Sequence, residues 1–433
     1  MKWLLYNCLF FVVYLAMLPL FLVRMRRRGG YRARMGDRFG RYPAGLFDAV
    51  ERPVWIHAVS VGEVGVAGQM MRALRERDPS IRFVLSTTSS TGWRQAEGQV
   101  GPGDVLIYNP LDFPLCVRRA LDAVRPRAII LTESEIWPNF IRAARRRGLP
   151  IFLVNARVSD RSAPRYRALR WFFGEVLRCF TRIFAQSGLD AERLLAAGAA
   201  KETLEVTGSF KFDVAHRRPD KEAELREWVG GGEILLGGST WPGEDAALLR
   251  IYRELLAAHP AAKLVIAPRH FEKADAVEEN IRAAGFECAR RSKMSGRVAA
   301  PQPGGTVWLC DTTGEMMGLF GIATVAFVGK SLCEHGSQNM IEPCLCGVAT
   351  VVGPYTENFR PVMSDLLAAG AILQVDGEDS LRAETLRLFG DPAAREALGA
   401  RAAEAVRRRC GVVGRCADEM LSIMRAAPAE AVA

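Results

Sequence analysis

Carboxylates follow two of the short apolar runs in the first half of the sequence. Glu63 closes the segment His-Ala-Val-Ser-Val-Gly-Glu at 57–63, while Glu133 and Glu135 follow a later run. The neighbouring segment 86–92 is rich in hydroxyl groups. A carboxylate beside hydroxyl-rich loops is suited to remove a proton from a sugar hydroxyl. The alternative is structural: Glu63 complements the dipole of a following helix, and Glu133 and Glu135 only begin another helix.

Strand-like runs and helical patterns alternate through this half of the chain. The runs are 54–59, 83–87, 105–108, 128–131, 151–154 and 183–185. This alternation predicts an α/β fold in which βα units build a parallel, doubly wound sheet. The carboxyl ends of the strands then meet at one edge, where such folds bind ligands. The candidate carboxylates, the hydroxyls and the arginines Arg157 and Arg161 are therefore expected to share one rim.

A second βα series begins in the other half. Its runs are 234–236, 264–267, 307–309, 322–328 and 350–352. Small residues, Arg269 and several helix starts follow them. This pattern suits a nucleotide, with phosphate on helix N-termini and Arg269, and base and ribose on side chains such as Glu342. His270, a lone histidine after a strand, has a structural role as its alternative.

The segment 328–347 is the most informative part of this series. It follows an apolar run and carries a Gly-bearing polar turn. Asn339 is a good N-cap residue with Glu342 three positions later, so a helix is expected to begin at Asn339. Its free backbone N–H groups would point into a loop at the carboxyl end of a strand, where α/β folds hold phosphates. The alternative is an ordinary strand-to-helix turn.

Several function classes are excluded by what the sequence lacks. It has no Walker A loop and no GxGxxG, so neither a P-loop kinase nor a Rossmann dehydrogenase fits. The five histidines show no HExxH-like spacing, so no catalytic metal is expected. The ten cysteines contain no CxxC pair and are expected to be reduced in a cytosolic body.

Length and charge give two further expectations. A chain of 433 residues predicts two domains, and the polar segment 217–227 is expected to be a linker leading into a helix. A net charge of +10 with a pI near 9.3 favours anionic partners. The sequence has no zinc finger, no RNP-type aromatic pattern and no Lys/Arg tail, so phosphorylated lipid or an acidic membrane is favoured over nucleic acid.

The N-terminus predicts a membrane anchor. Residues 3–23 are nearly continuously apolar, and a cluster of arginines follows at Arg24, Arg26, Arg27 and Arg28. About 20 apolar residues span a bilayer, and this cluster, against the single Lys2 before the run, places the C-terminal side in the cytoplasm. No A-x-A-like cleavage site follows, so the anchor is expected to be uncleaved. A monotopic anchor and a buried core helix are the alternatives.

Eight short motifs, in order along the chain, resemble the 3-deoxy-D-manno-octulosonic acid (Kdo) transferases of lipopolysaccharide assembly. They are HAVSVGE at 57–63, TTSSTG at 87–92, TESEIWPN at 132–139, NARVSDRS at 155–162, TGSFKFD at 207–213, APRH at 267–270, DTTGEM at 311–316 and AFVGKSL…GSQNMIEP between 326 and 343. The segment RARMGDRFG at 32–40 also resembles the start of the family. The resemblance covers almost the whole chain.

This resemblance implies a GT-B fold, with two Rossmann-like doubly wound domains facing a cleft and an N-terminal membrane anchor helix. The expected divisions are an anchor at 1–28, an acceptor-binding domain at 29–215 and a CMP-Kdo-binding domain at 216–433. The implied reaction is an inverting, metal-independent transfer of Kdo from CMP-Kdo to a lipid A precursor, lipid IVA. The implied location is the bacterial inner membrane, with the catalytic body on the cytoplasmic side. No cofactor and no nucleic-acid partner are expected.

Site residues follow from the same motifs. The resemblance makes Glu63 the general base on the acceptor hydroxyl, and makes Glu133 and Lys211 groups that stabilise the transition state. The residues expected to hold CMP are Pro268, Arg269, Gly314, Glu315, Met316, Asn339, Met340, Ile341 and Glu342.

The chain departs from the family pattern within the last of the eight motifs, between 326 and 343. Gly-Gly-His-Asn is expected there, but the sequence has Gly-Ser-Gln-Asn, with Gln338 in place of the histidine. Gln338 donates and accepts hydrogen bonds but carries no proton at neutral pH, so an acid role is not expected at this position. Met340 in place of proline removes only a preference for starting a helix.

Two other functions compete with this interpretation. One is another GT-B glycosyltransferase that uses a UDP-sugar on a lipid-linked acceptor, and the choice of donor separates it from a Kdo transferase. The other is a non-catalytic, membrane-tethered protein that binds a nucleotide or a glycolipid. Such a protein could lose Glu63 without losing binding.

A helix at 393–409 is expected to cross back to the first domain, and the chain from about Ala426 is expected to be a frayed tail.

Overall fold

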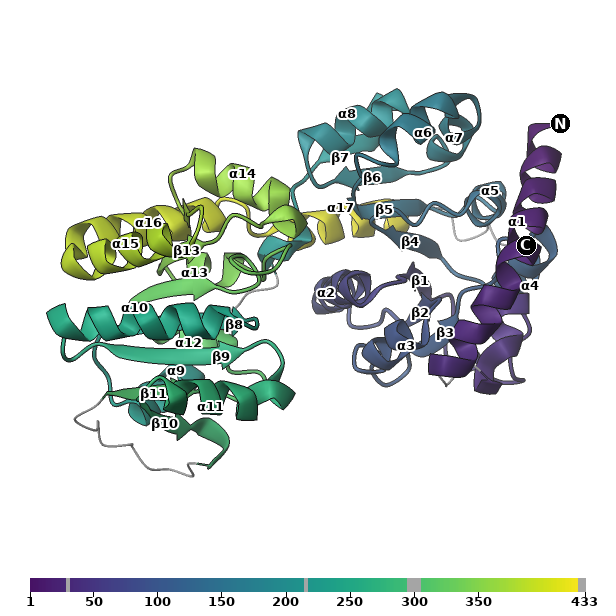
Figure 1. The fold of residues 1–433 in the computed structure, drawn as a ribbon. Helices are drawn as coiled ribbons and strands as arrows, with labels where there is room; N and C mark the ends of the chain where they lie inside the picture. Colours follow the sequence, from purple (N-terminus) through teal and green to yellow (C-terminus); the bar gives the residue numbers. More distant parts are fainter. Residues whose placement is uncertain (29–31, 214–216, 294–304, 427–433) are drawn as a thin grey trace. The chain divides into compact units, whose positions relative to one another are not determined.

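The computed structural model describes residues 1–28, 32–213, 217–293 and 305–426. The chain divides into two compact units. Unit 1 comprises Met1–Phe210 and Gly411–Ala433, and unit 2 comprises Lys211–Cys410. Each unit is built on a parallel sheet of seven strands with helices packed on it (Figure 1). The predicted doubly wound α/β architecture is therefore confirmed in both halves.

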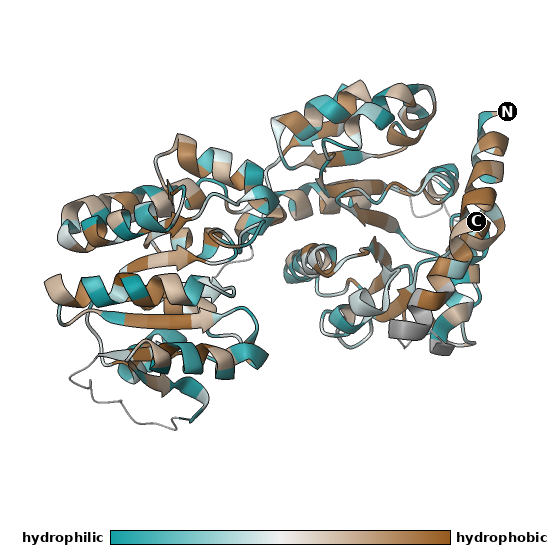
Figure 2. Ribbon diagram, viewed as in Figure 1, coloured by the Kyte–Doolittle hydropathy of each residue, from teal (hydrophilic) through white to brown (hydrophobic). Residues whose placement is uncertain are grey.

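The sheet of unit 1 has the strand order β3-β2-β1-β4-β5-β6-β7. Its strands are β1 (Val54–His57), β2 (Phe83–Thr87), β3 (Val105–Tyr108), β4 (Ala128–Thr132), β5 (Ile151–Ala156), β6 (Arg182–Ala185) and β7 (Leu204–Val206). All pairs are parallel. Strands β1, β2, β4 and β5 are buried along their whole length, because helices cover both faces of such a sheet. Their sequences are continuous apolar runs for this reason, and Figure 2 shows them mostly brown.

Two hydrophobic cores lie in unit 1. One contains side chains of α2 (Val61–Arg77) and α17 (Val412–Ala426). The other contains side chains of four helices, α4 (Pro114–Val124), α5 (Pro138–Arg146), α7 (Arg170–Leu177) and α8 (Gly188–Ala196). The remaining elements of the unit are α1 (Lys2–Arg28), the 3-10 helix η1 (Arg32–Phe39), α3 (Ser90–Glu97) and α6 (Ala163–Ala168).

The sheet of unit 2 has the order β10-β11-β9-β8-β12-β13-β14. Its strands are β8 (Ile234–Thr240), β9 (Lys263–Pro268), β10 (Glu287–Arg290), β11 (Thr306–Leu309), β12 (Val325–Val328), β13 (Ala349–Val352) and β14 (Leu373–Gln374). Its helices are α9 (Pro219–Val229), α10 (Glu244–Ala258), α11 (Ala274–Ala283), α12 (Met316–Ile322), α13 (Ile341–Leu345), α14 (Arg360–Ala368), α15 (Glu378–Gly390) and α16 (Pro392–Arg407). The run 322–328 was expected as one strand, but α12 ends at Ile322 and β12 begins at Val325.

The C-terminal end of the chain is divided differently from the expected boundaries. The second domain was expected to extend over 216–433, with a helix at 393–409 crossing back. In the structure α16 stays in unit 2, and the following helix, α17, belongs to unit 1. The reason is its apolar face: Val412, Val413, Cys416, Ala417, Met420 and Leu421 are buried in the core that contains α2. The frayed tail expected beyond Ala426 lies outside the described residues.

The segment between the units also differs from expectation. The polar stretch 217–227 was predicted as a linker leading into a helix, but α9 already occupies Pro219–Val229. Pro219 stands in the first turn, where its missing N–H costs nothing. The chain crosses from unit 1 to unit 2 earlier, at Phe210 and Lys211.

Helix α1 contains the predicted apolar segment. Over Lys2–Phe21 it is long and apolar enough to cross a membrane, with a mean hydropathy of 2.1. It is the only such helix among the described residues. Length and composition do not distinguish a crossing helix from one that lies in the membrane surface.

Candidate active site

The loops after β1 and β4 diverge at one point of the unit 1 sheet. Strands β1 and β4 are neighbours in the sheet. From β1 the chain continues to β2 and β3 on one side of β1, whereas β4 and the strands after it lie on the other side. Open α/β sheets bind ligands outside the carboxyl ends of their strands at such a switch point. Glu63 lies in the first turn of α2, the helix that follows β1, and the loop after β4 carries Glu133 and Glu135. The three predicted carboxylates therefore lie on the rim where a ligand is expected.

Glu63 stands in the first turn of α2 and is held by a capping arrangement. Its backbone N–H donates to the N-cap Ser60 Oγ at 3.3 Å. Its carboxylate accepts hydrogen bonds from Ser60 Oγ at 3.0 Å and from the Val59 N–H at 2.8 Å. Glu63 therefore has the structural role at the start of α2 that was its alternative, and these hydrogen bonds fix its carboxylate near the end of β1. A carboxylate has about four lone-pair sites, so these two bonds leave acceptor capacity for a substrate hydroxyl.

Glu133 lies on strained backbone. Its φ of 51° and that of Asn155, 54°, lie in the left-handed region, which non-glycine residues rarely adopt and which is frequent at functional sites. Asn155 Nδ2 is 3.4 Å from Glu133 Oε1, and Arg157 Nη1 is 3.7 Å from Glu133 Oε2. The Asn155 side chain also accepts the Phe210 N–H at 3.1 Å. Asn155 thus connects Glu133 to the residue that precedes Lys211.

His57 and Glu135 form a pair to which the sequence assigned no role. His57 is fully buried at the end of β1, and its Nδ1 lies 3.0 Å from Ser86 Oγ. Its Nε2 is 3.5 Å from Glu135 Oε2 and has no hydrogen-bond partner in the described part of the chain. Glu135 also accepts the Trp137 indole N–H at 2.9 Å. The Glu135 carboxylate thus lies close to the His57 ring at the end of β1.

Lys211 is the first residue of unit 2, between two anchored phenylalanines. Phe210 is fully buried in the α2 core of unit 1, and Phe212 is 3% exposed in a core of unit 2. Lys211 Nζ lies 3.4 Å from the Asn358 carbonyl oxygen and 4.4 Å from the centre of the Phe359 ring. The cation is therefore positioned beside the loop that follows β13.

The switch point of the unit 2 sheet lies between β8 and β12. Glu244, the first residue of α10, is fully buried there. Its carboxylate accepts four backbone N–H groups, those of Trp241, Lys330, Ser331 and Leu332, at 2.8 to 3.0 Å. Glu244 therefore connects the loop after β8 to the loop after β12. The sequence analysis did not single it out, because the bonds join segments about 86 residues apart.

The loop after β12 leads to the predicted helix start. Helix α13 begins at Ile341, two residues later than expected. The N-cap is Met340, and Asn339 just before it supports the helix start: its Oδ1 accepts the Ile341 N–H at 3.1 Å and its Nδ2 donates to Glu342 Oε1 at 2.9 Å. Burial raises the pKa of Glu342, and the bond from Asn339 partly offsets this. Met340 and Ile341 are fully buried, and the Ile341 N–H is already donated to Asn339.

The segment 314–316 follows β11. Gly314 has a φ of 81°, and its ideal Cβ position meets no atom within 4 Å. The Glu315 carboxylate accepts from Arg291 Nη2 at 3.0 Å and from the Thr312 hydroxyl. Burial would raise the pKa of Glu315, but the hydrogen bonds from Arg291 and Thr312 outweigh it and the pKa is lowered. This carboxylate is therefore already engaged by groups of the protein.

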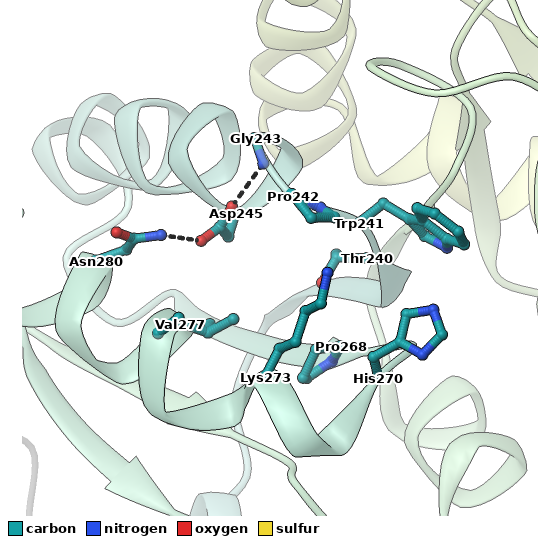
Figure 3. A pocket seen from close by; sticks show the side chains of 11 residues that line it. Thr240, Trp241, Pro242, Gly243, Asp245, Pro268, His270, Lys273, Val277 and Asn280 are labelled. Atoms are coloured by element: carbon teal, nitrogen blue, oxygen red, sulfur yellow. Dashed lines mark hydrogen bonds between the residues drawn. The ribbon is translucent and has the colours of Figure 1, made fainter.

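Pro268 is the last residue of β9, which lies beside β8, and Arg269 follows it. The Arg269 N–H donates to the Thr240 carbonyl at 3.0 Å, and the Arg269 side chain is exposed. Pro268 lines a small cavity of about 110 Å³ together with residues of the loop after β8, α11 and His270 (Figure 3). The Trp241 ring packs edge-on to His270 at 5.2 Å, and Lys330 Nζ lies 4.6 Å from the Trp241 ring centre. Lys330 is a second cation on this rim that the sequence analysis left without a role.

These predicted donor residues share one edge of the unit 2 sheet. Arg269, Gly314 and Asn339 follow β9, β11 and β12, which with β8 are consecutive in the sheet. Among the described residues no group of three or more His, Cys, Asp or Glu side chains is arranged to hold a metal ion.

Solved structures with this architecture are GT-B proteins. A UDP-GlcNAc 2-epimerase from Neisseria meningitidis, solved with UDP-GlcNAc, matches 86% of this chain and 100% of its own with a TM-score of 0.56 at 13% identity. The glycotransferase of kitacinnamycin matches 87% of this chain and 100% of its own with a TM-score of 0.52 at 17% identity. At these identities the likeness concerns the fold. The two doubly wound sheets therefore define a GT-B protein.

Sequence comparison gives the family. A profile described as 3-deoxy-D-manno-octulosonic-acid transferase (kdotransferase) matches residues 33–214. A 3-deoxy-D-manno-octulosonic acid transferase of Bordetella pertussis is 38% identical, over 92% of this chain and 94% of its own. One of Haemophilus influenzae is 32% identical, over 90% and 91%. The chain belongs to the Kdo transferase family of glycosyltransferases, as the ordered motifs predicted.

Proposed function

We propose that this protein transfers Kdo from CMP-Kdo to the glycolipid precursor of lipid A, with inversion and without a metal ion. Membership of the Kdo transferase family supports the transferred sugar. The observation that carries the mechanism is the Glu63 carboxylate, fixed at the switch point of unit 1 with acceptor capacity to spare. Unit 1 binds the acceptor and unit 2 binds the donor.

Glu63 is the general base. The acceptor hydroxyl is a poor nucleophile, and its proton passes to Glu63 as the oxygen attacks the anomeric carbon of Kdo. The new glycosidic bond forms while the bond from that carbon to the CMP phosphate oxygen breaks, and CMP leaves with the bonding electron pair. Glu133, held by Asn155 and Arg157, and Lys211 stabilise the charges that develop in this transition state.

Backbone groups and Arg269 hold CMP. Because the Glu315 carboxylate is engaged with Arg291, Glu315 and Gly314 contribute backbone N–H groups, while the buried Met340 and Ile341 support the nucleotide loop from beneath. Pro268 and Met316 pack beside the nucleotide. Asn339 and Glu342, which already bond to each other, present polar atoms to its base or ribose. The positive charge of Arg269 stabilises the leaving phosphate. In many transferases a divalent cation supplies this stabilisation, and here Arg269 takes its place.

The proposed acceptor and helix α1 both point to a location at a membrane. A glycolipid acceptor lies in a membrane, and α1 is apolar enough to associate with one. We infer that the protein acts at the cytoplasmic face of the bacterial inner membrane, where the arginines after residue 23 favour the cytoplasm.

The test is a donor comparison. The purified protein in detergent, with excess EDTA, is given the tetraacyl lipid A precursor and either CMP-Kdo or a UDP-sugar, and the lipid is followed by mass spectrometry. A mass gain of whole Kdo units with CMP-Kdo alone supports the proposal and counts the units added. Transfer from a UDP-sugar only would replace the donor. A requirement for added metal would remove the metal-independent mechanism.

A further inference from the structure

Helix α1 is docked on unit 1 at both ends. Near its start, the Trp3 indole N–H donates to Glu175 at 2.9 Å and the Tyr6 hydroxyl donates to Asp112 at 2.8 Å. Near its other end, the Phe21 ring lies 5.4 Å from the Arg38 guanidinium carbon. A helix held along its length by polar groups of the folded body lies beside that body. A space between α1 and the rest of unit 1 therefore has an apolar wall, formed by α1, and a second wall formed by loops at the rim of the sheet.

A cavity of about 400 Å³ occupies this space. Its helix wall is one face of α1, made by Phe10, Val13, Tyr14, Met17, Leu18 and Phe21. Its other wall comes from η1, from the loops after β2 and β3 and from the start of α5, and consists of Arg38, Thr88, Ser89, Asn109, Pro110, Leu111 and Trp137. The volume is in the range of small-molecule sites.

The shape and lining suit a hydrocarbon chain. From Phe10 to Phe21 the helix wall extends roughly 16 Å at 1.5 Å per residue, the length of an extended acyl chain. The residues of this wall are all apolar or aromatic. The opposite surface of α1 carries exposed Leu5, Leu9 and Val12, so the helix can contact a membrane on one side while its other side lines the cavity.

The far wall is mixed: Arg38, Thr88, Ser89 and Asn109 add polar and charged groups beside Pro110, Leu111 and Trp137. Arg38 is 5% exposed, donates to the Thr88 carbonyl at 2.6 Å and lies 4.5 Å from the Tyr108 ring centre. Its fixed positive charge favours an anionic headgroup at this wall. A ligand that fits both walls is amphipathic, with an apolar chain along α1 and a polar or phosphorylated head toward the sheet rim.

The polar part of this wall adjoins the candidate base. Ser89 lines the cavity and its hydroxyl donates to the Val59 carbonyl at 3.2 Å. The N–H of the same Val59 donates to the Glu63 carboxylate. Two hydrogen bonds therefore connect the cavity wall to Glu63, so a headgroup at this wall lies next to the group that is to remove its proton.

We propose that the cavity between α1 and the loops after β2 and β3 binds an acyl chain of the glycolipid acceptor and thereby delivers its sugar hydroxyl to Glu63. The inference rests on the proposed function and adds to it a subsite for the lipid. Helix α1 then acts as part of the acceptor site as well as an attachment to the membrane.

Site-specific photocrosslinking identifies the occupant. The photoreactive residue p-benzoylphenylalanine replaces Leu18, which lines the cavity, or Val12, which is 62% exposed on α1 outside it. The full-length protein is placed in nanodiscs of phosphatidylethanolamine and phosphatidylglycerol with a minor fraction of tetraacyl lipid A precursor. We expect the ratio of glycolipid to phospholipid adducts to be at least about tenfold higher at position 18. Equal ratios, or phospholipid adducts alone at position 18, would overturn the proposal.

A kinetic comparison separates the cavity from the chemistry. Leu18→Trp fills the cavity, and Val12→Trp adds the same bulk outside it. For Leu18→Trp we expect KM for the acylated acceptor to rise about tenfold, with kcat/KM for the deacylated glycan backbone unchanged. Equal losses on both acceptors, or no loss on either, would contradict the lipid subsite. If wild-type protein transfers Kdo to neither acceptor, the proposed function fails, while the crosslinking ratio still decides the occupant of the cavity.

Discussion

Ser60 and Glu63 hold each other at the start of α2. The Ser60 hydroxyl accepts the Glu63 N–H at 3.3 Å and donates to Glu63 Oε1 at 3.0 Å. Ser60 thus caps the N-terminus of α2, and the Glu63 carboxylate accepts a hydrogen bond from the Ser60 hydroxyl in return. The same contact that stabilises α2 orients the carboxylate proposed as the base, so stability and catalysis can be separated by choosing which partner is changed.

Removing the Ser60 hydroxyl tests how much the N-cap of α2 contributes to the stability of the protein. Ser60→Ala loses the hydroxyl, and we expect the free energy of unfolding to fall by about 1 kcal/mol. Ser60→Thr keeps the hydroxyl and is expected to remain near the wild-type value. Thermal unfolding of the two variants in detergent measures the difference. An alanine variant as stable as the wild type would show that the cap contributes nothing.

Glu244→Ala tests the connection between the loops after β8 and β12. The substitution leaves four backbone N–H groups without their shared acceptor, and we expect a loss of roughly 3 kcal/mol in stability. Because the loop after β12 leads to Asn339, KM for the donor should rise while KM for the acceptor does not.

The matched control for that experiment lies on the same helix. Glu254 is exposed and its carboxylate pairs with Arg382 at 3.1 Å; exposed ion pairs contribute at most about 1 kcal/mol. Glu254→Ala should leave both stability and donor KM nearly unchanged. Equal effects of the two substitutions would remove the role assigned to Glu244.

Met420→Ala tests the assignment of α17 to unit 1. Met420 is fully buried in the core that contains α2, and truncating a buried methionine to alanine costs about 2–5 kcal/mol. We expect hydrogen exchange to become faster in α2, at 61–77, and to stay unchanged in α16, at 392–407. Ser422→Ala, at an exposed position of the same helix, should change neither. Faster exchange in α16 instead would contradict the division of the chain.

The division of the chain also shows where sequence patterns stop being informative. Buried strands such as β1 and β4 are short continuous apolar runs, so their existence and their rim loops could be predicted. The edge strands β7, β10 and β14 were not predicted, because Glu205, Glu287 and Gln374 are exposed and break the apolar pattern. The amphipathic pattern of α17 indicates a helix but cannot say which of two cores receives it.

The same limit applies to the candidate site. Glu63 and Asn339 could be assigned to helix starts from local spacing. Glu63 forms the expected contact with its N-cap, whereas Asn339 lies one residue before the N-cap, Met340, and contacts the Ile341 N–H. Glu244 and the His57–Glu135 pair could not, because their partners come from other strands of the sheet. Long-range pairing of this kind depends on the strand order, which the sequence alone left open.

Asp112 gives stability an unusual pH dependence. Burial raises the pKa of its carboxyl to about 7, although hydrogen bonds from Asn139, Tyr6 and Phe140 lower it. The ordinary value is 3.8, so between about pH 4 and pH 7 the folded state binds more protons than the unfolded state, and this group's contribution to stability falls as the pH rises. Asp112→Asn does not titrate, so its deficit relative to wild type should be larger at pH 5 than at pH 8.

Melting temperatures of wild type and Asp112→Asn at the two pH values measure this deficit. Asp379→Asn, at an exposed position in unit 2, controls for the loss of a carboxylate as such and should show the same small difference at both pH values. A deficit for Asp112→Asn that grows from pH 5 to pH 8 would show that Asp112 is stabilised as the carboxylate.

The most direct test of the account is the rate of Kdo transfer by Glu63→Gln. Glutamine keeps an oxygen that accepts the Val59 N–H but takes up no proton. With CMP-Kdo, the tetraacyl lipid A precursor and EDTA, we predict that kcat falls by roughly 10²- to 10⁴-fold while the melting temperature stays near that of the wild type. Ser60→Ala should lower stability, and its loss of transfer should be much smaller than that of Glu63→Gln, because the Val59 N–H still holds the carboxylate. Transfer by Glu63→Gln at the wild-type rate would contradict the assignment of Glu63 as the base.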